Sequence, residues 1–247
     1  MRISLPPGQG ATVNVFLGTA KDMDGVRAAL QTCRRPDFVS RSSDALKSWW
    51  DRHLAHFSCG IPDAEAQRQI NIWNPCQAQR NFLFSRNISY YSTGTFRGVG
   101  FRDTAQDVLA QTPLDNPSAQ QKLRELFGQQ YQDGHTNHYY FPTEGWDPLK
   151  RLHSDNHIWP ILGVWNSVME AGSAEFLEEK VPFFDGGQGT VYDHLFRAVA
   201  FAQAHLGANG FPLMLTSDWN DMLYKVCRQG RGSRSTHVCR RTGKRRG

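Results

Sequence analysis

Helical periodicity runs through most of this chain and constrains its fold more than any other feature. Apolar residues recur every three to four positions, which predicts amphipathic helices, over residues 24–33, 43–59, 64–91, from 104 onward, 117–130, 155–171 and 190–206. The loops between these ranges carry polar and aromatic residues. We therefore expect a mainly α protein in which antiparallel helix pairs stack into a toroid, with the function on loops at one rim.

Two places depart from this helical pattern. Pro75 falls inside the range 64–91. Because proline removes a backbone donor and clashes with the preceding turn, we expect a kink there or a new helix that starts near it. Residues 11–17 (ATVNVFL) are rich in β-branched residues and alternate in part, so they predict a strand. A lone hairpin is marginal in water, so this strand would belong to a sheet that is mostly missing.

The positive net charge of the chain comes from its last residues. Residues 222–247 hold nine Lys or Arg and no acid, which leaves a net charge of −4 on the first 221 residues. A nucleic-acid-binding protein would carry its basic residues on a folded face with aromatic residues among them. The tail has no such pattern, so we expect residues 229–247 to be disordered and expect no nucleic-acid partner.

Three absences in the sequence limit its environment. No apolar run approaches the ~20 residues that span a bilayer, and no signal peptide follows Met1. The five cysteines are odd in number and form no CxxC pair, which favours free thiols in a reducing compartment. The histidines between 135 and 157 fit no common zinc spacing. We therefore expect a cytoplasmic protein with no metal and no membrane partner.

The segment SDWND (217–221) places two acids on either side of an indole. Asp218 could simply cap a helix that begins at Trp219. Asp221 would lie at the third helical position, where the helix dipole also favours an acid. Alternatively, Asp221 donates a proton to a leaving oxygen. Its carboxyl must then stay protonated near neutral pH, which burial beside Trp219 would favour.

A second cluster of charged residues lies in RGVGFRDTAQD (97–107). An Arg–Asp pair beside its glycines could be a structural clamp, formed by Arg97 or Arg102 with Asp103. Alternatively, Asp103 accepts hydrogen bonds from sugar hydroxyls and Arg97 donates to them, while the glycines let the backbone approach the ligand. The segment does not complete GxGxxG, so it does not predict a dinucleotide-binding loop.

Five segments of the chain stand out in order: NIWNPCQAQRNFLFSRNISYY (71–91), TFRGVGFRDTAQD (95–107), YQDGHTNHYY (131–140), HSDNHIWP (153–160) and TSDWND (216–221). Together they resemble the inverting phosphorylases of glycoside hydrolase family 94. This family includes cellobiose, cellodextrin and chitobiose phosphorylases and the phosphorylase-like end of cyclic glucan synthases. The resemblance extends from about Asn71 to Arg228 and implies an (α/α)6 barrel preceded by helical linkers and a β-sandwich.

The same resemblance implies a division of the chain and a set of site residues. Residues 1–18 would be a remnant of the β-sandwich, 19–63 a helical linker and 64–228 the first part of the barrel, while the basic tail 229–247 departs from the family pattern. The general acid would be Asp221. The residues implied at the substrate, as donor-sugar contacts or near the pocket at the barrel rim, are Arg86, Arg97, Asp103, Trp219, Asp155 and His157.

The activity implied is reversible phosphorolysis of a β-linked gluco-disaccharide or oligosaccharide, with release of an α-sugar 1-phosphate by inversion. Inorganic phosphate is the co-substrate and no cofactor is needed. An inverting glycosidase needs a second carboxylate to activate water, whereas phosphate arrives already anionic. The family's phosphate site lies in the half of the barrel that this sequence lacks, so we expect the chain alone to be inactive.

Two other functions stay open. The chain could be the phosphorylase-like module of a cyclic β-glucan synthase, or a carbohydrate-binding remnant without turnover. The family is also compatible with a homodimer of the full-length protein.

Overall fold

The computed structural model describes residues 3–84, 98–141, 151–208, 210–217 and 219. Arg86, Arg97, Asp221 and the basic tail lie outside the described residues. The chain divides into two compact units, residues 1–53 and 54–247.

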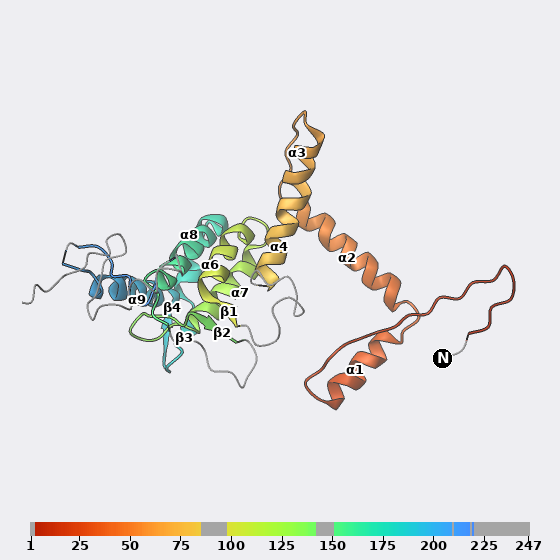
Figure 1. Cartoon of the computed structure of the whole chain (residues 1–247), viewed down its shortest axis with the longest axis horizontal. Helices are drawn as coiled ribbons and strands as arrows, with labels where there is room; N and C mark the ends of the chain where they lie inside the picture. Colours follow the sequence, from red (N-terminus) through yellow and green to blue (C-terminus); the bar gives the residue numbers. More distant parts are fainter. Residues whose placement is uncertain (1–2, 85–97, 142–150, 209, 218, 220–247) are drawn as a thin grey trace, which may run out of the picture. The chain divides into compact units, whose positions relative to one another are not determined.

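The first unit is a helical segment with little core (Figure 1). It contains α1 (Met23–Cys33) and the first sixteen residues of α2 (Phe38–Leu54). Asp22 caps α1 by accepting a hydrogen bond from the Gly25 N–H. Helix α1 buries no residue and α2 buries only His53, whose ring stacks on Trp49 one turn earlier.

Two expectations for this unit are wrong in detail. Helix α2 starts at Phe38, so the predicted start at Ser43 falls inside the helix. The strand predicted over residues 11–17 is not formed, and these residues are exposed. A strand needs a neighbour to satisfy its backbone N–H and C=O groups, and the strands that the structure describes pair only with one another. The assignment of residues 1–18 to a β-sandwich stays a prediction.

Pro75 lies where the helical backbone changes its geometry. Helix α3 (Ala64–Arg68) continues into the π-helical turn η1 (Gln69–Trp73), and α4 (Asn74–Phe84) follows directly. Proline cannot donate to the carbonyl four residues earlier, and its ring would collide with that group. A wider π turn just before Pro75 accommodates both effects. The expected restart of the helix near Pro75 is confirmed.

The core of the second unit forms where three helices pack side by side (Figure 1). Helices α6 (Phe101–Gln111), α7 (Asn116–Phe127) and α8 (Trp159–Ala171) contact one another, and α4 packs on α6. Gly163 makes this approach possible, because a Cβ there would lie 2.9 Å from the Leu123 Cδ2 atom. The most buried apolar side chains of these helices are Phe101, Ala105, Val108, Ala119, Leu123, Leu126, Phe127 and Val164.

Local sequence signals set the helix boundaries in this unit. Asp115 caps α7 and accepts a hydrogen bond from the Ser118 N–H at 3.1 Å. Thr190 and Asp193 form a capping box at the start of α9 (Val191–Ala204). The 3-10 turns η2 (Asn156–Ile158) and η3 (Glu175–Glu178) precede α8 and β3.

Two short antiparallel ladders complete the described structure. Strand β1 (Val99–Gly100) pairs with β2 (Tyr139–Tyr140), and β3 (Lys180–Pro182) pairs with β4 (Gln188–Thr190). The mainly α character is therefore confirmed. None of the helices in the described part of the chain is both long enough and apolar enough to cross a bilayer.

Gly134 offers a direct test of this packing. Its φ is 96°, and an added Cβ would overlap the backbone carbonyl oxygen of Arg197 on α9. Gly134→Ala should lower the free energy of unfolding by roughly 2 kcal/mol or more, because backbone strain and overlap add. Urea denaturation measures this. Gly60→Ala is the control, since a Cβ there meets nothing within 4 Å; equal losses in the two variants would contradict the packing described.

Candidate functional site

The first link in the candidate site joins RGVGFRD to the segment that contains HTNHYY. Val99 lies opposite Tyr140, and Gly100 opposite Tyr139, in the β1–β2 ladder. The Phe101 N–H then donates to the His138 carbonyl at 3.0 Å. The first turn of α6, which carries Asp103, is thereby fixed beside residues 138–140.

A second link joins HSDNHIWP to the beginning of SDWND. The Ser154 N–H donates to the Ser217 carbonyl at 2.9 Å, and the Thr216 N–H donates to the Leu152 carbonyl at 2.8 Å. Leu215, the residue before Thr216, has a φ of 53°, which is uncommon for a residue with a side chain. These bonds place the described part of SDWND directly beside residues 152–154.

Histidine rings connect these two pairs of segments. The rings of His138 and His153 stack with centroids 3.8 Å apart and planes 4° from parallel. Asn156 Nδ2 lies 3.5 Å from His138 Nδ1. The histidines that the sequence analysis discounts as zinc ligands therefore serve as contacts between segments.

An ion pair connects the two segments again through α6. Arg102 Nη1 lies 3.4 Å from each carboxylate oxygen of Asp155, and the Trp159 indole N–H donates to Asp155 Oδ2 at 3.0 Å. The structure therefore pairs Asp155 with Arg102. The family resemblance instead implies a place near the substrate for Asp155, and the local sequence suggests only Asp103 as a partner of Arg102. Fifty-three residues separate the two partners, so no local pattern reveals this pair.

Asp103 lies in the first turn of α6 and is half-buried. Its carboxylate lies against Gly100, where an added Cβ would be 2.6 Å from Asp103 Oδ2. The sequence analysis attributes the glycines to close approach of a ligand. The structure shows that Gly100 makes room for the carboxylate of Asp103.

Trp219 and His157 differ in their exposure to solvent. Trp219 is 64% exposed, so the described residues do not provide the burial that we expected beside this indole. His157 is only 3% exposed, and its ring meets the Phe201 ring edge-on at 4.9 Å. Burial lowers the pKa of His157 to about 4, with smaller contributions from His205 and His135. Its Nε2 has no hydrogen-bond partner among the described residues.

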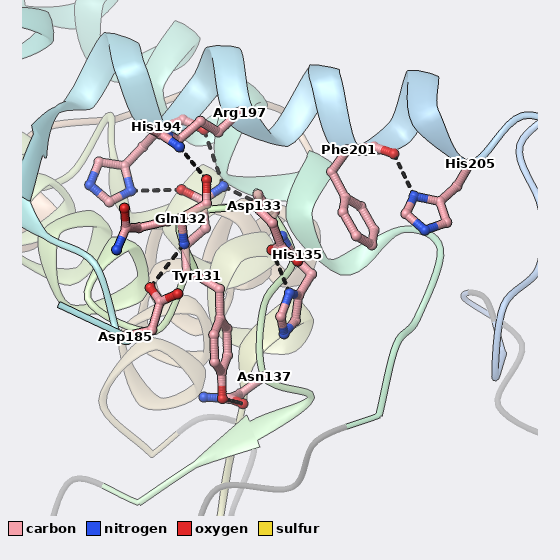
Figure 2. Close-up of polar contacts among 12 residues, drawn as sticks. Tyr131, Gln132, Asp133, His135, Asn137, Asp185, His194, Arg197, Phe201 and His205 are labelled. Atoms are coloured by element: carbon pink, nitrogen blue, oxygen red, sulfur yellow. Dashed lines mark hydrogen bonds and ion pairs between the residues drawn. The ribbon is translucent and has the colours of Figure 1, made fainter. Parts of the chain in front are cut away.

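The turn that precedes β2 is fastened to α9 by contacts that the sequence analysis missed (Figure 2). His194 is fully buried, with Nδ1 2.6 Å from Gln130 Oε1 and Nε2 3.1 Å from the Val181 carbonyl. Gln130 Nε2 donates to the Gly134 and His194 carbonyls. Burial is the main cause that lowers the pKa of His194. A buried Gln–His pair has no sequence signature, because both residues are common on helix surfaces.

The same turn presents polar and aromatic groups on its other side (Figure 2). The Tyr131 ring stacks on His135 at 4.0 Å, and its hydroxyl donates to Asn137 Oδ1 at 3.2 Å. His135 Nδ1 lies 2.5 Å from Asp133 Oδ1. Among the described residues, no three His, Cys, Asp or Glu side chains come together as metal ligands.

Comparison with known proteins identifies the family. The model of the glycosyl hydrolase 94 superfamily catalytic domain matches residues 49–239. The chain belongs to the glycosyl hydrolase 94 superfamily. This range includes all four segments that meet in the structure.

Individual relatives agree with this placement. The glycosyl hydrolase 94 chain is 31% identical over 246 residues to N,N'-diacetylchitobiose phosphorylase from Vibrio furnissii, covering 89% of this chain and 30% of that protein. It is 32% identical over 250 residues to the cyclic beta-(1,2)-glucan synthase NdvB from Rhizobium meliloti, covering 94% and 9%. It is 28% identical over 230 residues to solabiose phosphorylase from Paenibacillus borealis, covering 93% and 28%. The chain thus spans less than a third of each of these relatives.

Replacing Gly100 tests whether the glycosyl hydrolase 94 chain needs the observed position of Asp103. Gly100→Ala should displace the carboxylate, because the new methyl group would occupy its place. If Asp103 contacts a sugar, as the family resemblance implies, the affinity of the complete protein for that sugar should fall roughly tenfold or more, as for loss of a hydrogen bond to a charged group. Isothermal titration calorimetry measures this. Gly60→Ala is the control, and unchanged affinity in Gly100→Ala would contradict a role for the carboxylate at this position.

Because His157 is buried, we expect the folded protein to lose stability at acidic pH. Its folded-state pKa lies below the ordinary value of 6.5, so folding favours the neutral ring. The stabilisation is complete above pH ~6.5 and is lost as the pH falls toward 4, by at most about 3 kcal/mol. Urea denaturation at a series of pH values should show this slope. His157→Phe should flatten it in part, because His194 also has a lowered pKa; an unchanged slope would contradict the assignment.

Proposed function

We propose that this chain forms part of the catalytic site of an inverting glycoside phosphorylase that acts on a β-linked gluco-disaccharide or oligosaccharide. The observation that carries the proposal is the meeting of four segments, RGVGFRD, HTNHYY, HSDNH and the start of SDWND, within the range matched by the family's catalytic domain. The similarity to phosphorylases of N,N'-diacetylchitobiose and solabiose supports this reaction.

In this proposal Asp221 is the general acid. Arg86, Arg97, Asp103 and Trp219 contact the donor sugar. Ser217, four residues before Asp221 in the sequence, is hydrogen-bonded to Ser154, which supports a position of the acid near these segments. The half-buried Asp103 can accept hydrogen bonds from sugar hydroxyls, and the exposed Trp219 indole can pack against the apolar face of a sugar ring.

The proposed reaction needs a single proton donor from the protein. An oxygen of inorganic phosphate attacks the anomeric carbon from the face opposite the glycosidic bond. As that bond breaks, Asp221 gives its proton to the departing oxygen. Inversion converts the β-linkage into an α-sugar 1-phosphate, and the reverse reaction uses the same groups. No cofactor takes part.

The wider architecture is part of the same proposal. Helices α6, α7 and α8 would belong to the first part of an (α/α)6 barrel, and another part of a complete catalytic domain would supply the phosphate site. We propose a cytoplasmic enzyme, compatible with a homodimer.

A second candidate rests on the 32% identity to the glucan synthase NdvB. The chain would then be a phosphorylase-like module of a much longer protein. The length of the gene around this sequence separates the two, since the chain covers 30% of one relative and 9% of the other.

Replacing the acid tests the proposal. In the complete protein that contains this sequence, Asp221→Asn should reduce release of sugar 1-phosphate from a β-disaccharide and phosphate by about 10²-fold or more. Sugar affinity, measured by calorimetry, should stay unchanged. Asp44→Asn, on the exposed surface of α2, is the matched control. Unchanged turnover in Asp221→Asn would show that Asp221 is not the general acid. Wild-type protein that binds sugar without turnover would favour a carbohydrate-binding remnant.

A further inference from the structure

We propose that Arg102 and Asp155 form a positioning pair that holds Asp103 in register with the segment leading to the general acid. The inference rests on the proposed function and concerns two residues that need not touch the sugar. It gives Asp155 a role different from the substrate contact that the family resemblance implies.

The pair connects two of the four segments that meet in the structure. Arg102 precedes Asp103 in the first turn of α6, and its side chain is 8% exposed. Asp155 follows Ser154, whose N–H is bonded to the Ser217 carbonyl. One ion pair and one backbone hydrogen bond therefore connect the first turn of α6 to the segment that carries Trp219.

The Asp155 carboxylate is fixed from two directions. Arg102 Nη1 lies 3.4 Å from both of its oxygens, and the Trp159 indole N–H donates to Oδ2 at 3.0 Å. Trp159 is the first residue of α8 and packs against the apolar core. The carboxylate thus ties α6 to the start of α8, and a shift of either helix would break one of these contacts.

The energetics of buried charges favour a role in orientation. Removing a guanidinium and a carboxylate from water is costly. Apolar residues of similar volume often stabilise a fold at least as much as a buried ion pair does. An ion pair whose carboxylate also accepts from an indole N–H, in contrast, fixes the orientation of the carboxylate as well as its distance from the guanidinium. Small errors in the position of reacting groups slow a chemical step strongly, so orientation is the property that this site needs.

Kinetics of the complete protein separate positioning from direct binding. Arg102→Gln and Asp155→Asn should each lower kcat by about 10- to 100-fold, while KM for the disaccharide rises less than it does in Asp103→Asn. The double variant should lose less kcat than the product of the two single losses, because both single variants remove the Arg102–Asp155 ion pair. Arg102→Lys should recover part of kcat, since an ammonium can still reach Asp155. Asp103→Asn, as a direct contact, should instead raise KM.

A second ion pair provides the matched control. Arg124 forms a bidentate pair with Glu179, at 2.7 Å and 2.9 Å, between α7 and the residue that precedes β3. Arg124→Gln removes a pair from the same unit whose two partners are not part of the four segments. It should lower thermal stability without lowering kcat. Equal losses of kcat in Arg124→Gln and Arg102→Gln would show that Arg102 acts only through general stability.

A spectroscopic readout decides the inference even without turnover. In protein labelled with 5-fluorotryptophan, the Trp219 resonance is assigned with Trp219→Phe. Arg102→Gln should shift or broaden this resonance, and Arg124→Gln should leave it in place. A complete protein that forms no sugar 1-phosphate refutes the proposed function alone. An unmoved Trp219 resonance in folded Arg102→Gln protein, or kinetics identical to wild type, overturns the positioning pair.

Discussion

Two backbone hydrogen bonds, from Ser154 to Ser217 and from Thr216 to Leu152, support the rest of the candidate site. They join segments separated by more than sixty residues and place the start of SDWND beside HSDNH. The other contacts of the site, including the stacked rings of His138 and His153, hold HSDNH to α6 and β2. Through these contacts Ser217, two residues before Trp219, is held in the same framework as Asp103.

The helical core supplies the frame for these loop contacts. Helices α6, α7 and α8 pack closely because Gly163 leaves space for Leu123 and Val108. This packing sets the distance between the first turn of α6 and the first turn of α8, which Arg102, Asp155 and Trp159 then connect. The apolar packing of these helices therefore fixes the positions of the polar groups at their first turns.

The sequence predicted the parts of the fold that depend on local patterns. Periodicity predicted the helices, and Pro75 marked a change within one of them, because proline sterics act over a few residues. The strand predicted at residues 11–17 is not formed, because a strand depends on a partner elsewhere that a local pattern does not reveal. For the site, the motifs identified which segments matter. The Arg102–Asp155 pair escaped prediction because its geometry exists only after folding.

The central claim is a single site that transfers a sugar to phosphate with inversion. Its most direct test is the proton NMR spectrum of the product formed by the complete protein from a β-linked disaccharide and inorganic phosphate. An α-sugar 1-phosphate, recognised by the small coupling between its H1 and H2 protons, is the predicted result. A β-sugar 1-phosphate, or free reducing sugars with no phosphate consumed, would contradict the account.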